Sequence, residues 1–98
     1  MSKRYYVYML ASKKNGTLYV GVTSNLERRI EVHKAKYVKK SFTAKYSVHN
    51  LVYFEIYDNP NDAIYKEKQL KWWKRDWKIG LIEKANSEWN DLSKEIFI

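Results

Sequence analysis

The sequence predicts an α+β fold in which a small antiparallel three-stranded sheet is flanked by helices, in the order β-β-α-β-α-α. Two runs of β-branched and aromatic residues near the start are joined by too few residues for a crossover, so they pair as an antiparallel hairpin. A third such run follows a stretch of helical periodicity, and further helical stretches complete the order. With 98 residues, 45% of them hydrophobic, we expect one domain over residues 1–98.

The predicted hairpin occupies residues 5–10 and 18–22, and the turn between them contains Asn15 and Gly16. An Asn-Gly pair between two β-forming runs is a strong signal for a hairpin turn. Residues 51–57, with the sequence Leu-Val-Tyr-Phe-Glu-Ile-Tyr, are expected to form the third strand. The polar and basic stretch before this strand has no helical period, so we predict a loop there.

Side chains alternate along a strand, and this alternation places two of the hairpin tyrosines together. Across an even-length loop without a bulge, residues whose numbers sum to an odd value share a face. Tyr8 and Tyr19 therefore point to the same side, with Tyr6 and Gly21. A two-residue loop would offset the two rings along the strands, whereas a loop of about six residues would bring them opposite each other. The sequence leaves both registers open, and ordinary packing of tyrosines would also explain the pattern.

A helix is expected after the hairpin, capped by Ser24 and Glu27 and ending near Lys36. Two polar residues fall within its apolar stripe. At about 100° per residue, Arg29 lies roughly 60° and His33 roughly 20° from the apolar residue that opens the stripe. A buried histidine with satisfied hydrogen bonds would explain His33 equally well. An arginine charge is seldom buried without a partner, and its planar guanidinium suits a phosphate.

Three further helices are expected after the third strand. Pro60 at a first helical position opens one over residues 60–73, and two more are predicted over residues 75–85 and 87–95. Within the middle helix, the residues expected to face inward are Trp77, Leu81, Ile82 and Ala85.

A carboxylate lies in the middle of the apolar face of the first of these three helices. Glu67 falls about 40° from Ala63, between Ile64 and Leu70. A pair with Lys71 at i, i+4 is the ordinary explanation, but such a pair stabilises a helix by only about 0.2–0.5 kcal/mol. Because desolvating a carboxylate costs several times more, a hard cation such as Mg²⁺ is the alternative explanation.

The charge of the chain is strongly positive and unevenly distributed. The net charge is +8; residues 1–46 hold 11 basic and 2 acidic side chains, whereas residues 47–98 hold 8 basic and 9 acidic ones. This asymmetry predicts a polyanion that faces the first half of the chain. The absence of cysteine excludes disulfides and thiolate zinc sites. Since no signal peptide or membrane span is evident, we expect a cytoplasmic protein with no membrane contact.

Residues 66–75 offer a less favoured alternative to nucleic-acid binding, namely binding to a lipid surface. This basic stretch could form an amphipathic helix on a lipid surface. Its Trp72 and Trp73 could instead pack on the final helices or stack on nucleic-acid bases.

Together these residues resemble the GIY-YIG nuclease superfamily. The matching features are Tyr6-Val7-Tyr8, then Tyr19-Val20-Gly21, then Arg29 and His33 on the next helix, and Glu67 on a later one. More closely, the chain is similar to the small stand-alone bacterial members called UPF0213 or excinuclease C-like proteins. One departure is that Tyr6 stands where the family name has glycine, so a larger side chain narrows access on the expected pocket side.

The resemblance implies a divalent-metal-dependent endonuclease that hydrolyses phosphodiester bonds of DNA, with a role in DNA repair or recombination. In that case Tyr19 helps to deprotonate the attacking water or, with Tyr8, positions it. Arg29 stabilises charge on the scissile phosphate, and His33 carries a proton. A tyrosine with an ordinary pKa near 10 is a poor base at neutral pH, so Arg29, nearby lysines or metal-bound water would have to lower that pKa.

The resemblance also implies that Glu67 binds one divalent ion, Mg²⁺ or Mn²⁺. Asn86 is a further, tentative counterpart of a functional asparagine in repair-associated relatives. We expect phosphate contacts from the basic residues of the first helix and the loop after it. These are Lys34, Lys36, Lys39, Lys40 and Lys45.

Two alternative functions are compatible with the same sequence. One is a nucleic-acid-binding protein of this fold, with RNA as a candidate ligand, that has little or no catalysis. The other is an interaction protein in which the tyrosines are core residues, so that changing Arg29 or Glu67 would alter mainly thermal stability. Only the nuclease produces a cleaved product.

Overall fold

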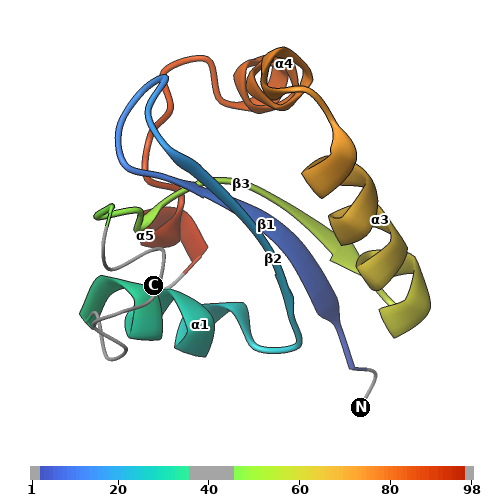
Figure 1. Ribbon diagram of the computed structural model, residues 1–98. Coiled ribbons are helices and arrows are strands. Elements are labelled where there is room, and N and C mark those ends of the chain that lie inside the picture. The colour runs from blue at the N-terminus through green and yellow to red at the C-terminus, as the bar shows by residue number, and fades with distance from the viewer. Residues whose placement is uncertain (1–2, 36–45, 97–98) are drawn as a thin grey trace.

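The structure, a computed structural model, describes residues 3–35 and 46–96. The strands are β1 (Tyr5–Ala11), β2 (Leu18–Thr23) and β3 (Asn50–Tyr57). The helices are α1 (Leu26–Ala35), α3 (Pro60–Trp72), α4 (Arg75–Ala85) and α5 (Ser93–Ile96). The sheet is antiparallel in the order β2-β1-β3, so β1 is its central strand (Figure 1). The predicted α+β fold and order of elements are confirmed.

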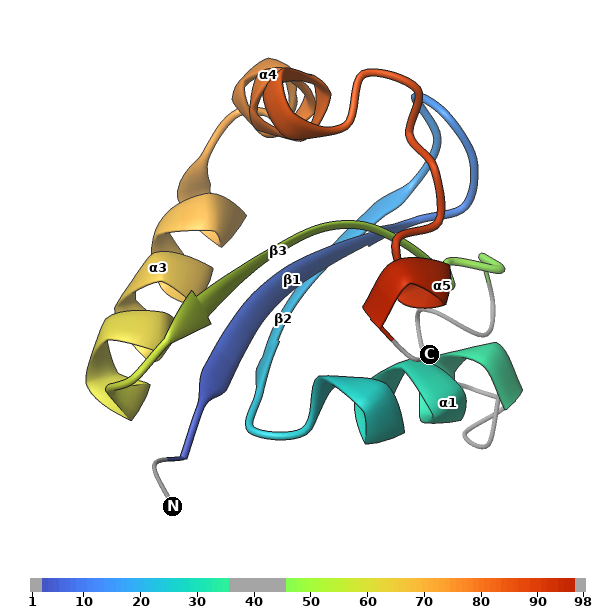
Figure 2. The same cartoon turned by 180° about the vertical axis from the view of Figure 1, so that it is seen from behind.

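Helices cover both faces of the sheet. Seen from opposite sides, α1 and α5 lie on one side of the strands, and α3 and α4 lie on the other (Figures 1 and 2). Because successive side chains of β1 point to opposite faces, they belong to two different hydrophobic clusters. The apolar cluster beneath α3 and α4 includes Val7, Met9, Val20, Ala63, Leu70 and Ile82. The cluster beneath α1 includes Tyr8, Leu10, Leu26, Ile30 and Leu51.

The hairpin loop decides the register that the sequence left open. β1 ends at Ala11 and β2 begins at Leu18, and these two residues pair across the strands. The loop is therefore the wider of the two alternatives, but the tyrosines are still offset. Tyr8 pairs with Gly21, and Tyr19 pairs with the residue two positions after Tyr8. The two phenols are diagonal neighbours on one face, as the odd-sum rule predicts.

The N-terminus of α1 differs from the prediction. The cap is Asn25, whose side-chain oxygen accepts a 3.0 Å hydrogen bond from the backbone N–H of Arg28. The predicted cap, Ser24, is one residue too early, because Thr23 Oγ1 accepts from the Asn25 N–H at 3.0 Å and ends the strand there. The α1 bounds are otherwise those expected, up to the edge of the described residues.

The start of α3 follows the prediction, whereas the inward face of α4 does not. Asn59 caps α3 by accepting a 2.7 Å hydrogen bond from the Asn61 N–H, and Pro60 occupies the first turn. In α4, Ile82 is buried as expected, but Trp77 and Ala85 are exposed. Only one side of this short helix reaches the sheet, so fewer side chains are buried than its periodicity predicted.

The predicted helix over residues 87–95 is wrong over most of its length. Only α5 is helical, and Trp89 has a left-handed φ of 57°, which a continuous helix cannot contain. The buried Trp89 donates its indole N–H to Glu83 Oε2 at 2.8 Å. Tertiary contacts therefore override the helical propensity of this segment.

Across the described helices, none has the length and apolar character needed to cross a bilayer.

Candidate active site

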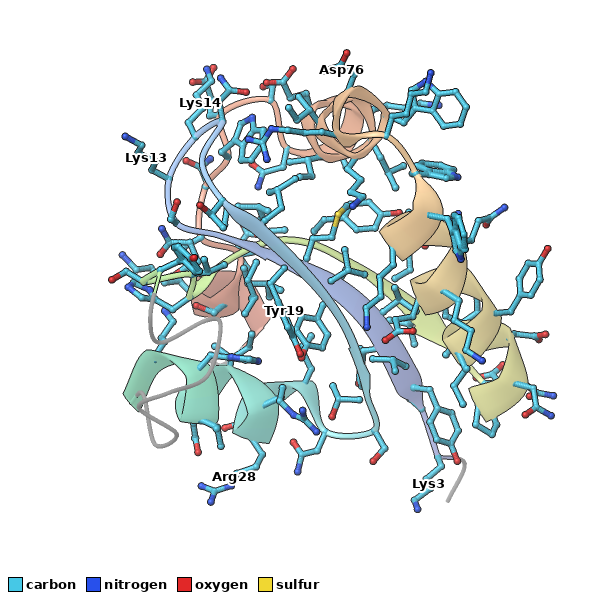
Figure 3. The ribbon with its side chains drawn as sticks, viewed as in Figure 1. Lys3, Lys13, Lys14, Tyr19, Arg28 and Asp76 are labelled. Atoms are coloured by element: carbon cyan, nitrogen blue, oxygen red, sulfur yellow. The ribbon has the colours of Figure 1, made fainter. Side chains whose placement is uncertain are left out.

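Three aromatic side chains from three elements meet on the face of the sheet that α1 covers. Tyr8 comes from β1, Tyr19 from β2 and His33 from α1, and Figure 3 shows Tyr19 on the side of β2 that faces α1. The ring centroids of the two tyrosines are 6.2 Å apart, and that of His33 lies 6.2 Å from Tyr8 and 5.3 Å from Tyr19. The Tyr8 hydroxyl oxygen is 3.3 Å from His33 Nε2. The structure therefore brings three of the predicted site residues together.

Gly21 makes this arrangement possible. A Cβ built on Gly21 would overlap the Tyr8 hydroxyl and lie 2.5 Å from Cζ of the same ring. The Tyr8 ring thus lies across the backbone of its cross-strand partner. A strand glycine often marks such a close approach, and here the approaching group is a predicted site residue.

Arg29 joins the cluster from the solvent side. It lies one helical turn before His33 on α1, and its side chain is exposed rather than turned fully inward. The Arg29 guanidinium lowers the pKa of both the Tyr8 hydroxyl and the His33 imidazole. An exposed guanidinium beside buried polar rings can meet an incoming anion, which a buried one could not.

Burial sets the protonation states of the two groups in hydrogen-bond contact. Burial first, and the Tyr19 phenol next, raise the pKa of Tyr8 well above its usual value, although the charge of Arg29 offsets part of this. Burial and then Arg29 hold the pKa of His33 below its usual value. At neutral pH Tyr8 keeps its proton and His33 is neutral. The pKa of Tyr8 therefore moves opposite to the direction that a tyrosine base requires.

The four residues of the cluster differ in their exposure to solvent. Tyr8 is completely buried, whereas Tyr19 and His33 are half-buried and Arg29 is exposed. Substrate can reach the last three but not the first. The Tyr8 hydroxyl contacts His33 Nε2 from this buried position.

Glu67 stands apart from this cluster. It belongs to α3, whose buried residues pack against the other face of the sheet. Its side chain is only 14% exposed, and its Oε2 lies 2.7 Å from the Nζ of Lys71. The i, i+4 pair that the sequence offered as the ordinary explanation is therefore formed.

Among the residues that the structure describes, no group of three or more His, Cys, Asp or Glu side chains could hold a metal ion. Glu67 could instead serve as the single protein ligand of a cation. A single carboxylate suits a hard cation that takes its other ligands from water and phosphate oxygens. Lys71, its partner, is about half exposed, so its ammonium can turn away into solvent.

Of the five predicted phosphate-binding lysines, Lys34 is the one within the described residues. Its Nζ donates to Asp91 Oδ2 at 2.6 Å and to Ser93 Oγ at 3.1 Å, which ties α1 to the start of α5. Burial would raise the pKa of Asp91, but hydrogen bonds from Lys34 and Ser93 hold it below its usual value. The other four lie outside the described residues: Lys36, Lys39, Lys40 and Lys45.

Asn86 has a structural position. It is 6% exposed, and both the nitrogen and the oxygen of its side-chain amide form hydrogen bonds with backbone groups. Its Nδ2 donates to the carbonyls of Val52 at 3.1 Å and Asn90 at 2.9 Å, and its Oδ1 accepts from the Asn90 N–H at 3.0 Å. These bonds fasten the segment after α4 to β3. The contacts give Asn86 a structural task, and its tentative functional role stays a prediction.

A cavity of about 380 Å³ lies beside the cluster, on the same face of the sheet and at the N-terminal end of α1. Its lining includes Arg4, Tyr6, Asn25 and Phe54. Tyr6, which replaces the glycine of the family name, forms part of its wall. The lining also includes Glu27, so the hollow is polar and aromatic, with one basic and one acidic side chain.

The fold and these residues define a family. Residues 4–80 match the sequence model described as the GIY-YIG catalytic domain. The chain belongs to the GIY-YIG family, which is a family of nucleases.

Curated relatives of similar length share most of the sequence. The chain is 37% identical to the UPF0213 protein CPE1444 of Clostridium perfringens over 95 residues, which cover 93% of this chain and 96% of that one. It is 40% identical to a UPF0213 protein of Pediococcus pentosaceus over 80 residues, or 82% of each chain. The solution NMR structure of the UPF0213 protein BH0048 from Bacillus halodurans has a similar fold. It has a TM-score of 0.56 and 24% identity, and it covers 93% of this chain and 95% of the other.

Proposed function

We propose that this protein is an endonuclease that hydrolyses phosphodiester bonds of DNA at the cluster of Tyr8, Tyr19, Arg29 and His33. The observation that carries the proposal is the hydrogen bond between the Tyr8 hydroxyl and His33 Nε2 beside an exposed arginine. Hydrolysis of a phosphodiester needs a proton acceptor for water and a positive group for the phosphate oxygens. A neutral imidazole and a guanidinium supply these two functions.

Each residue has a distinct part in the proposed reaction. His33 accepts the proton of the attacking water, because its lowered pKa keeps the imidazole neutral at pH 7. Tyr8 fixes the orientation of the His33 ring from its buried position, and Tyr19, half-buried beside the same ring, positions the water. Arg29 stabilises the negative charge that accumulates on the phosphate oxygens. The raised pKa of Tyr8 argues against that phenol as the general base, and His33 is the proposed base instead.

The proposed cofactor is one divalent cation, Mg²⁺ or Mn²⁺. GIY-YIG nucleases typically use divalent metals. Glu67 is the proposed protein ligand, but α3 covers the face of the sheet opposite the Tyr8 and His33 cluster, so a cation on Glu67 would contact phosphates of the nucleic acid away from the bond that is cut. The proposal for Glu67 rests on its low exposure and single carboxylate, and its partner Lys71 must give way to the cation.

The chain contains a natural control for the proposed base, because it has two histidines, His33 and His49. Plasmid, single-stranded and branched DNA, and RNA are incubated with purified protein in Mg²⁺ or Mn²⁺. We expect His33→Gln to reduce the cleavage rate about 10²- to 10⁴-fold, the usual contribution of a general base, and His49→Gln to leave it unchanged.

Three outcomes separate the explanations. Equal cleavage by all variants would identify a contaminating nuclease. Salt-sensitive binding without product would favour the nucleic-acid-binding protein that the sequence left as an alternative. Preferential cleavage of RNA would overturn the assignment of DNA as the substrate.

The metal proposal has its own test. Chelation of divalent ions should abolish cleavage, and Mg²⁺ or Mn²⁺ should restore it. Glu67→Gln is expected to raise the metal concentration needed for half-maximal cleavage, and Lys71→Ala to lower it, because the second change frees the carboxylate. An unchanged metal requirement in Glu67→Gln would remove Glu67 from the metal site.

A further inference from the structure

The outward side of α3 carries two aromatic residues in line. Tyr65 is 71% exposed and Trp72 is 89% exposed. They are seven residues apart, so they lie within about 20° of each other around the helix and about 10.5 Å apart along its axis. Lys68, also exposed, lies between them on nearly the same side. We call these three residues the α3 stripe.

The fold does not require the α3 stripe. The buried residues of α3 are Ala63 and Leu70, which pack in the cluster against the sheet. Tyr65 and Trp72 contribute large aromatic surface to solvent instead. Because exposing such rings brings no packing benefit, a ligand that covers them is the simplest physical reason for their presence.

The surroundings of the α3 stripe are basic. Residues 66–78 contain six Lys or Arg and two Asp or Glu side chains. The same stretch holds Trp73 and Trp77, whose rings meet edge to face at 5.9 Å, and the Nζ of Lys66 lies 5.3 Å from the Trp73 ring centroid. Trp77 is itself exposed. Alternating cations and exposed rings therefore continue from α3 around the corner into α4.

We infer that the α3 stripe, Tyr65, Lys68 and Trp72, binds unpaired nucleotides of a nucleic-acid strand. Aromatic rings offer faces on which unpaired bases can stack, and lysines between them can contact the phosphates. The charge of the surface is complementary to a polyanion. The inference rests on the proposed function only for the identity of that polyanion.

The shape of the stripe distinguishes this ligand from a lipid surface. An interfacial helix needs a broad apolar face to bury in the bilayer. The apolar face of α3 is already used against the sheet, and the outward side alternates aromatic and charged residues. Such alternation suits separate bases and phosphates better than a continuous layer of acyl chains.

The position of the α3 stripe gives it a different task from the proposed active site. α3 covers the face of the sheet opposite the cluster of Tyr8 and His33. A strand held there is not at the residues proposed to cut it. The stripe is therefore an anchoring surface, which holds one part of a nucleic acid while another part reaches the proposed active site.

The test measures binding without cleavage, so a failure of the proposed chemistry cannot be mistaken for a failure of this inference. A fluorescent 20-nucleotide oligothymidylate and a duplex of equal length are titrated with the full chain in the presence of a chelator. We expect Trp72→Ala to weaken binding of the single strand about 5- to 150-fold, the range for loss of one stacked base. Trp72→Phe should restore most of that binding.

Two further variants sharpen the measurement. Ile64→Ala is the matched control, because it removes an exposed apolar side chain from the same helix about 100° from Tyr65, and it should change binding less than twofold. Lys68→Ala should reduce the slope of log affinity against log salt by about 0.7, the value for one phosphate contact on a single strand.

Three results would overturn the inference. One is unchanged oligothymidylate binding in Trp72→Ala when circular dichroism shows that the variant is folded. Another is an equal loss for single strand and duplex, because stacking requires unpaired bases. The last is a loss of binding to vesicles of anionic lipid with no loss for the oligonucleotide, which would make the α3 stripe a membrane surface.

Discussion

The two faces of the sheet use the same strand for different purposes. In β1, Val7 and Met9 point into an apolar cluster beneath α3, while Tyr8 points to the opposite face, where it meets His33. On β1, the side chains that face α3 are apolar, whereas Tyr8 on the other side carries a hydroxyl that needs a hydrogen-bond partner. Strand alternation alone thus separates the part of the protein that stabilises the fold from the part proposed to carry the chemistry.

The difference between the faces shows why a small domain can hold a reactive cluster. The apolar face supplies most of the close packing, so the other face can devote buried volume to a phenol and an imidazole. Two helices cover each face, but the polar face opens to solvent at Arg29. Changes to the buried apolar residues beneath α3 should therefore alter stability, and changes to the cluster of Tyr8, Tyr19, Arg29 and His33 should alter the chemistry.

The largest expected effect on stability is at the centre of the apolar face. Leu70 is fully buried between α3 and the sheet, so Leu70→Ala should lower the free energy of unfolding by about 2–5 kcal/mol. Urea denaturation measures this loss. Cleavage per folded molecule should stay at the wild-type value. A lower rate in molecules shown to be folded would mean that the two faces are coupled.

Alanine substitutions at two glycines test how tightly each face of the sheet is packed. Gly21→Ala forces a Cβ into the Tyr8 ring and should cost about 1–3 kcal/mol as well as slow cleavage. Gly80 in α4 has nothing within 4 Å of an added Cβ, so Gly80→Ala should stabilise the protein by about 0.5–1 kcal/mol. Thermal melting and cleavage assays check both. If Gly21→Ala costs the same in a Tyr8→Ala background, the clash is not the cause.

Asn86 tests whether a buried polar residue outside the cluster is structural. Asn86→Ala removes hydrogen bonds to β3 and to the following turn, and should lower the free energy of unfolding by about 1–3 kcal/mol. The cleavage rate of the folded fraction should not change. A normal melting temperature with lost cleavage would instead support the functional role that the resemblance implied.

The smallest expected effect is a pH dependence from His33. Because its folded-state pKa is lowered, unfolded chains protonate first as pH falls below about 6.5, so stability should decline there until the folded-state pKa is passed. For the same reason, the acidic limb of kcat/KM should lie below pH 6.5. His33→Gln should remove both dependences. An acidic limb above pH 7 would contradict the assignment of His33 as the base.

The parts of the fold that depend on neighbouring residues could be predicted from the sequence. The three strands, the start of α3 at Pro60 and the shared face of Tyr8 and Tyr19 all follow from periodicity and turn sequences. The contact of His33 with the tyrosines also agrees with its place in the stripe of α1. Local patterns therefore predict that Tyr8, Tyr19 and His33 lie together.

The features that could not be predicted depend on contacts between residues far apart in the sequence. The segment after α4 is shaped by Asn86 bonds to β3 and by Trp89 in a left-handed conformation, and no local pattern indicates either. The ion pair of Lys34 with Asp91 joins residues 57 positions apart, so no local pattern indicates it, and the phosphate contact of Lys34 stays a prediction. The raised pKa of Tyr8 likewise depends on burial, which only the packed structure reveals.

The most direct test of the polar face compares two adjacent arginines. Arg28 and Arg29 are both exposed on α1, but Arg28 points away from the protein (Figure 3) and pairs with Glu31. Arg29 instead lowers the pKa of both Tyr8 and His33. Single-turnover cleavage should fall about 10²- to 10³-fold in Arg29→Ala, with an unchanged melting temperature, and should match wild type in Arg28→Ala. Equal rates in the two variants would contradict the proposal that the chemistry takes place on this face.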